Sequence, residues 1–304
     1  MNHRYYENKN RYIELENLQN IGNQTGGSKK NKLLFIMFPG FGTPKNGWDT
    51  TDIDKNDRII RTNFITELKK LGEVYFHSPA YHNLNYYDKK NKYRSLYDKN
   101  IDFSKDDFNI PLVCDKIYDD LKDFDGKFIL ISHSIGSYFM YYFQKKYYSK
   151  CLFAVNIDGS PIGPFSQTKD DVKYLDPKIN KYNKYTNEDI DKLKDRVFDN
   201  DPKAIRKLFD IAIYNIFDSK KLNYKAKKLK IPWISFFNFT ISDDMKKRHI
   251  YINAKRAKEI EYFSKNNADY RAITFINKTH FPHQQNDSRE IILEEIKLMI
   301  KKYT

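Results

Sequence analysis

From residue 33 onward, the apolar positions of the chain follow two alternating patterns. Short continuous apolar runs, such as LLFIMF at 33–38, indicate strands that are buried on both faces. Between these runs the apolar residues recur at helical spacing, and such alternation is typical of a parallel sheet with helices on both faces. The expected strands are 33–38, 73–81, 127–132, 151–157, 231–240 and 271–277, and the expected helices are 58–72, 109–124, 134–148, 252–266 and 288–303.

The alternation divides the chain into a core and an insertion. Residues 1–31 form a polar lead that ends in the turn-rich stretch GNQTGGSKKN, and one edge strand can be fitted within it. The core is expected to comprise 32–158 and 231–304. Between these parts, residues 159–230 contain no buried strand and instead match two amphipathic helices, so we expect a helical cap over the strand ends.

A turn that carries reactive side chains follows the expected strand 127–132. It reads Ser132-His133-Ser134-Ile135-Gly136 and leads into an apolar helical segment. A sharp strand-to-helix turn crowds the neighbouring backbone, so the small residues Ser132 and Gly136 are what such a turn requires. Ser134 is therefore expected to be exposed at the carboxyl end of the sheet, beside the amides of a helix N-terminus.

This turn resembles the nucleophile elbow of the α/β-hydrolase superfamily, Gly-x-Ser-x-Gly, with Ser132 in place of the first glycine. The resemblance extends over roughly residues 33 to 304, because the other parts of the superfamily's site follow in the required order. It implies an α/β-hydrolase fold, with a mostly parallel sheet covered by helices on both faces. It also implies that Ser134 is a nucleophile, with no metal and no cofactor, since serine acyl transfer needs neither.

The segment FPGFG at 38–42 resembles the His-Gly-x-Gly turn of the superfamily, which supplies half of an oxyanion hole. Pro39 stands where many members have histidine, which matters little because the donors are main-chain amides. By this resemblance, the amides of Phe41 and Ile135 would bind the negatively charged oxygen of a tetrahedral intermediate.

The segment KTHFPHQ, after the last expected strand, resembles the terminal histidine loop of the superfamily. The resemblance makes His280 the general base for Ser134. His283 is the competitor, because it lies in the same loop.

Two places in the chain offer an acid to orient the imidazole. Asp158, in VNIDGSPIG, resembles the Asp-Gly-Ser-Pro stretch that carries the acid in fatty-acid-synthase-type thioesterases. Asp243 and Asp244, in TISDDM, follow the next strand, which is the commoner position in the superfamily. The sequence leaves this choice open, since each aspartate could instead cap a turn or a helix.

The activity implied by the resemblance is hydrolysis of a carboxylic ester or thioester through an acyl-enzyme. Apolar residues in the expected cap favour a small-molecule or lipid-like substrate with an apolar acyl group. The alternative is a catalytically inactive α/β-hydrolase-like protein that serves as a binding or scaffold module.

Charge and composition change this interpretation little. The chain has 54 Lys and Arg against 40 Asp and Glu, a net charge of +14. The basic residues are interspersed with acids and accompanied by no nucleic-acid-binding motif, so we expect a solvated surface and no specific nucleic-acid partner, with weak attraction to anionic membranes left open.

Two cysteines exclude a disulfide framework, and the absence of a signal-like or spanning apolar segment predicts a cytoplasmic protein. The oligomeric state is not predicted.

Overall fold

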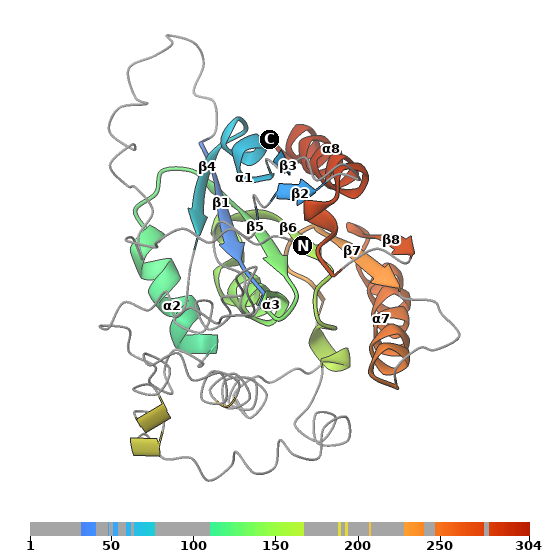
Figure 1. Ribbon diagram of the computed structural model, residues 1–304. Helices are drawn as coiled ribbons and strands as arrows, with labels where there is room; N and C mark the ends of the chain where they lie inside the picture. The colour runs from blue at the N-terminus through green and yellow to red at the C-terminus, as the bar shows by residue number, and fades with distance from the viewer. Residues whose placement is uncertain are drawn as a thin grey trace.

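A six-stranded parallel sheet forms the centre of the computed structural model (Figure 1). The structure describes residues 32–40, 48, 51–53, 59–61, 64–76, 110–166, 188–189, 192–193, 207, 228–239, 247–276 and 280–304. The strand order is β4-β1-β5-β6-β7-β8, which places β5 and β6 at the centre. The strands are β1 (Leu33–Phe38), β4 (Glu73–Phe76), β5 (Lys127–His133), β6 (Cys151–Ile157), β7 (Trp233–Phe239) and β8 (Tyr270–Ile276).

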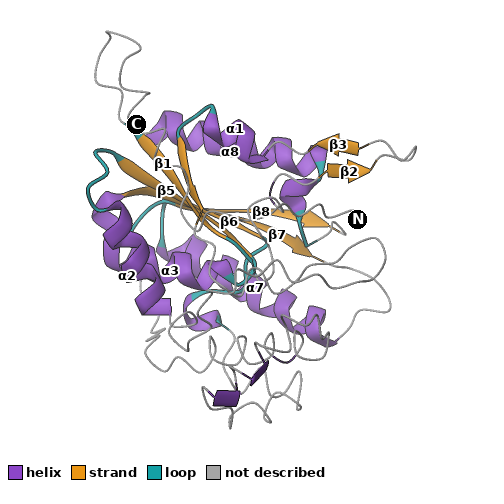
Figure 2. Ribbon diagram, turned by 60° about the vertical axis from the view of Figure 1, so that its left-hand side comes forward, coloured by secondary structure: helices purple, strands orange, loops and turns teal. Residues whose placement is uncertain are grey.

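Helices cover both faces of this sheet, as Figure 2 shows. Helices α2 (Ile110–Leu121), α3 (Gly136–Tyr147) and α7 (Lys247–Asn266) lie on one face, and α1 (Phe64–Lys69) and α8 (Asn286–Tyr303) lie on the other. This arrangement confirms the expected fold class.

The central strand β5 shows why its sequence is a continuous apolar run. Phe128 and Leu130 belong to the apolar cluster beneath α2, α3 and α7, whereas Ile129 and Ile131 belong to the cluster beneath α1 and α8. All four side chains are fully buried. Burial of each contributes about 1.5–3 kcal/mol, so the carboxyl end of β5 projects from a rigid base.

The structure corrects the expected helix at 58–72. Ile59–Arg61 form strand β3, which pairs antiparallel with β2 (Thr51–Ile53), and helix α1 begins only at Phe64. Ile59 and Ile60 are adjacent β-branched residues, and such residues favour an extended chain over a helix. The other expected strands and helices of the core are confirmed within the described residues, whereas residues 77–81 of the expected strand 73–81 lie outside them. Residues 1–31 and most of 159–230 lie outside the described residues, so the lead and the cap stay predictions.

The described part of the chain also bears on the cysteines and on membrane-spanning segments. Cys114 and Cys151 are buried free thiols, as their apolar surroundings in the sequence predict. Among the described helices, none combines the length and the apolar character needed to cross a bilayer.

The elbow depends on a close approach between Gly136 and the end of β1. A Cβ atom on Gly136 would collide with the carbonyl oxygen of Phe38 and would lie 2.7 Å from that of Pro39. Both obstacles are backbone atoms, which cannot move aside as the end of a side chain can.

We therefore predict that Gly136→Ala lowers the free energy of unfolding by about 1–3 kcal/mol, the usual range for overpacking. Urea denaturation of the variant and the wild type measures this difference. Lys146→Ala is the control on the same helix, because it removes exposed contacts with Asp115 and the ring of Tyr147; an exposed ion pair is worth up to about 1 kcal/mol. Equal losses in both variants would contradict the packing argument.

Helix α7 buries an acidic side chain against the segment that follows β6. Glu259 is fully buried, and its Oε2 atom accepts a hydrogen bond of 2.8 Å from the amide of Ile162. Burial raises the pKa of Glu259 to about 8, so the folded protein holds it as a neutral acid at neutral pH. The unfolded chain, in contrast, releases this proton near the ordinary pKa of 4.5.

This difference predicts that Glu259 makes the folded state less stable as the pH rises. Its stabilising contribution is complete below the ordinary pKa of 4.5 and declines as the pH rises toward about 8, by at most about 1.4 kcal/mol per pH unit. Glu259→Gln keeps an oxygen acceptor but cannot ionise, so the stability of the variant relative to the wild type should increase with pH. Urea denaturation at several pH values between 5 and 8.5 tests this, and a constant difference across the range would refute it.

Candidate active site

Ser134 lies at the sharp turn between β5 and α3. Its φ of 53° is in the left-handed region, which L-residues with a side chain rarely adopt. The turn is held on both sides: the Ser134 amide donates to the carbonyl of Ile157 at 3.3 Å, and its own carbonyl accepts from the amides of Ser137 at 3.2 Å and Ser160 at 2.9 Å. The side chain is only partly covered. A strained, partly exposed serine at the carboxyl end of a central strand is the geometry expected of an elbow.

The chain that leaves β1 passes directly against this elbow. A Cβ atom on Gly40 would lie 2.8 Å from the Cβ of Ser134 and 2.6 Å from Nδ1 of His133, so only glycine allows this approach. Phe41, the next residue and an expected oxyanion donor, lies outside the described residues. Ile135, the other expected donor, immediately precedes α3 and has a buried side chain. Ser132, also part of the turn, is buried and donates to the side-chain oxygen of Asn156.

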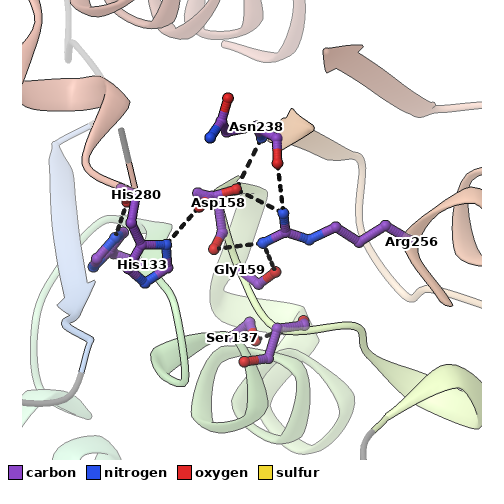
Figure 3. A network of polar contacts seen from close by, with 8 residues as sticks. His133, Ser137, Asp158, Gly159, Asn238, Arg256 and His280 are labelled. Atoms are coloured by element: carbon purple, nitrogen blue, oxygen red, sulfur yellow. Dashed lines mark hydrogen bonds and ion pairs between the residues drawn. The ribbon is translucent and has the colours of Figure 1, made fainter. Parts of the chain in front are cut away.

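Asp158 and His280 are brought together at the end of β6, although 122 residues separate them in the chain (Figure 3). Nδ1 of His280 lies 2.5 Å from Oδ2 of Asp158. The Asp158 side chain is 4% exposed and that of His280 is 48% exposed, so the acid is buried and the imidazole is accessible. Because Nδ1 is used by the carboxylate, Nε2 is the nitrogen available for exchanging a proton with another group.

The other carboxylate oxygen of Asp158 has partners of its own. Oδ1 accepts from the amide of Asn238 at 2.8 Å and pairs with Nη1 of Arg256 at 2.9 Å. Burial by itself would raise the pKa of Asp158, but the Arg256 charge, together with hydrogen bonds from His280 and Asn238, lowers it to about 2. Asp158 is therefore ionised at neutral pH.

His133, the residue before Ser134, connects the elbow to the loop that carries His280. Its Nε2 lies 2.7 Å from the carbonyl oxygen of His280, and the two imidazole rings are 4.7 Å apart. A carbonyl only accepts, so Nε2 of His133 carries the proton. Burial and the nearby His280 lower the pKa of His133 to about 3, which leaves it neutral. His133 thus places His280 close to the turn that holds Ser134.

His283, the competitor for the role of base, is located differently. It is completely buried and stacked on Trp48, with ring centroids 4.4 Å apart. Burial lowers its pKa well below the ordinary value, so it is a neutral packing group. The geometry therefore favours His280, which is accessible and bonded to a carboxylate. Asp243 and Asp244, the alternative acids, lie outside the described residues.

Reasoning from the sequence assigned no role to Arg256, which contacts the candidate acid directly. A signal was nevertheless present: Arg256, Glu259 and Phe263 share one face of α7 at helical spacing, and all three are buried. Two ionisable residues on the apolar stripe of a helix indicate a buried polar network. Within the described part of the chain, no cluster of three His, Cys, Asp or Glu side chains could hold a metal ion.

The sequence matches no protein-family model and no curated protein. Solved structures do match. An epoxide hydrolase from Vigna radiata has a TM-score of 0.56 and 13% identity, over 90% of this chain and 92% of that one. A probable hydrolytic enzyme from Pseudomonas aeruginosa has a TM-score of 0.54 and 12% identity, over 89% and 86%. A carboxylesterase structure from Nitrososphaera gargenis has a TM-score of 0.52 and 12% identity, over 91% and 94%. The chain has the fold of the α/β-hydrolase superfamily.

Proposed function

We propose that this protein is a serine hydrolase that cleaves a carboxylic ester or thioester through an acyl-enzyme on Ser134. The observation that carries the proposal is the hydrogen bond between His280 and the buried carboxylate of Asp158, beside the turn that presents Ser134. A nucleophile, an accessible base and a group that orients the base are the components of serine acyl transfer.

Each residue has a defined role in this mechanism. Ser134 attacks the carbonyl carbon while its proton passes to Nε2 of His280, and Asp158 stabilises the resulting imidazolium. The amides of Phe41 and Ile135 stabilise the negatively charged oxygen of the tetrahedral intermediate. His280 then protonates the departing alcohol or thiol, and afterwards accepts a proton from the water that cleaves the acyl-enzyme.

The chemistry of serine separates this proposal from the epoxide hydrolase reaction named for one structural relative. Attack of a serine hydroxyl on an epoxide would form an ether, which water at neutral pH does not cleave. Attack on an ester or thioester forms a new ester, which His280 and water can hydrolyse. The carboxylesterase from Nitrososphaera gargenis is thus the nearer functional analogy among the relatives named above. An apolar acyl group, bound beneath the expected cap at 159–230, is the proposed substrate feature.

The first test is covalent labelling of the purified protein by a small fluorophosphonate, followed by peptide mass spectrometry. We expect modification of Ser134 in the wild type, none at that position in Ser134→Ala, and labelling slowed by about 10²–10⁴-fold in His280→Ala, because the general base is lost. Hydrolysis of p-nitrophenyl acetate should fall in parallel.

His283→Phe is the matched control within the same loop, since it keeps an aromatic ring against Trp48. We expect the folded variant to retain labelling and hydrolysis, whereas loss of both in His283→Phe but not in His280→Ala would reverse the assignment of the base. A folded wild type that neither reacts at Ser134 nor hydrolyses the ester would overturn the proposal in favour of an inactive binding module.

A further inference from the structure

Arg256 reaches from helix α7 into the turn that follows β6 (Figure 3). It is 6% exposed, and its guanidinium makes four polar contacts. Nη1 contacts Oδ1 of Asp158 and the carbonyl of Asn238, both at 2.9 Å. Nη2 donates to the carbonyls of Asp158 at 3.0 Å and Gly159 at 2.9 Å. One side chain therefore binds the carboxylate and the backbone of the same aspartate.

We propose that Arg256 is a positioning residue for catalysis, which holds Asp158 in its left-handed conformation and reserves one carboxylate oxygen for His280. This inference rests on the proposed hydrolase function and adds a residue that the serine mechanism does not itself require.

The backbone of Asp158 needs this support. Its φ of 43° is unfavourable for a residue with a side chain, by about 1–2 kcal/mol. Two consecutive carbonyls, those of Asp158 and Gly159, both accept from Nη2 of Arg256, and the Asp158 amide donates to the carbonyl of Phe236 at 2.6 Å. Relaxation of the strained residue would break these bonds, so the guanidinium fixes the direction in which the Asp158 side chain leaves the strand end.

The carboxylate itself is divided between two sets of partners. Oδ1 is bound by the Asn238 amide and by Arg256, and Oδ2 is bound by Nδ1 of His280. Rotation of the carboxylate would break bonds to both oxygens at once. The imidazole therefore meets an acceptor that is already oriented, which is the preorganisation that a catalytic group needs.

The positive charge of Arg256 has a second effect that is separable from its shape. It stabilises the ionised carboxylate, and it also repels an imidazolium that forms on His280 during the reaction. Removing the charge leaves the buried carboxylate of Asp158 without its cationic partner, whereas removing only the planar guanidinium keeps a cation beside it. The substitution Arg256→Lys keeps the positive charge without the planar guanidinium, and Arg256→Gln removes the charge.

Glu259 provides a control on the same buried face of α7, one turn further along. It binds the amide of Ile162, and within the described structure it makes no hydrogen bond to Asp158 or His280. Because burial raises the pKa of Glu259 to about 8, its replacement by glutamine changes little at neutral pH.

The experiment compares full-length wild type, Arg256→Lys, Arg256→Gln and Glu259→Gln. For each, we would measure thermal unfolding, kcat and KM for p-nitrophenyl acetate between pH 5 and 9, and the downfield NMR resonance of the Nδ1 proton of His280. Both Arg256 variants should lose about 10- to 100-fold in kcat with little change in KM, the loss expected for a misplaced catalytic group. In Arg256→Gln, the loss of kcat should be larger than in Arg256→Lys, because the charge that lowers the pKa of Asp158 is removed as well.

The outcomes separate the positioning role from a merely structural one. A folded Arg256→Gln with wild-type kcat, profile and Nδ1 resonance would overturn the inference, and so would a loss of kcat matched by an equal loss of folded protein. Loss of kcat in Glu259→Gln equal to that in the Arg256 variants would also overturn it. If the wild type has no hydrolase activity, the proposed function fails, and an Nδ1 resonance unchanged in Arg256→Gln would then refute the positioning of Asp158 independently.

Discussion

The arrangement of the candidate site depends on one constraint, the burial of the ionised Asp158 carboxylate at the end of β6. An isolated buried charge costs several kcal/mol, so the fold has to surround it with donors. These donors come from the end of β7, from α7 and from the loop before α8, through Asn238, Arg256 and His280. One carboxylate thus joins three segments that are distant in the chain, and each of them also packs on the central sheet.

The accessible imidazole of His280 is held from two sides by strand ends of the sheet. The His280 ring is oriented by Asp158 at the end of β6, and its backbone carbonyl is bound by His133 at the end of β5. These strands are hydrogen-bonded neighbours in register, with His133 opposite Ile157. A rigid sheet therefore sets both the rotation of the imidazole and the place of its main chain, which is the preorganisation that loops alone do not provide.

Local sequence patterns were sufficient for the sheet and for the tight turn at Ser134, but they did not decide between competing side chains. The continuous apolar runs predicted the strands because each strand is covered on both faces, and small residues around Ser134 predicted the tight turn. The stretch at 58–63 misled because Ile60 has helical spacing with Phe64, while the pairing of Ile59–Arg61 with Thr51–Ile53 is a non-local effect. The difference between His280 and His283 is also non-local, since both share one loop, while Asp158 binds one ring and Trp48 stacks on the other.

The same reasoning explains why the acid stayed open in the sequence. Asp158 and the pair at 243–244 each follow an expected strand in a turn-like context, and each place resembles a position of the acid in the superfamily, so the local pattern does not decide between them. In the structure, Asp158 is bound by Arg256, almost a hundred residues later in the chain, and by a backbone amide that no sequence pattern reveals. Residues 243–244 lie outside the described residues. A carboxylate so firmly bound by a guanidinium gives up part of its attraction for an imidazolium and gains a fixed orientation in return. The network therefore determines two properties of the carboxylate that His280 contacts: the positive charge beside it and its orientation.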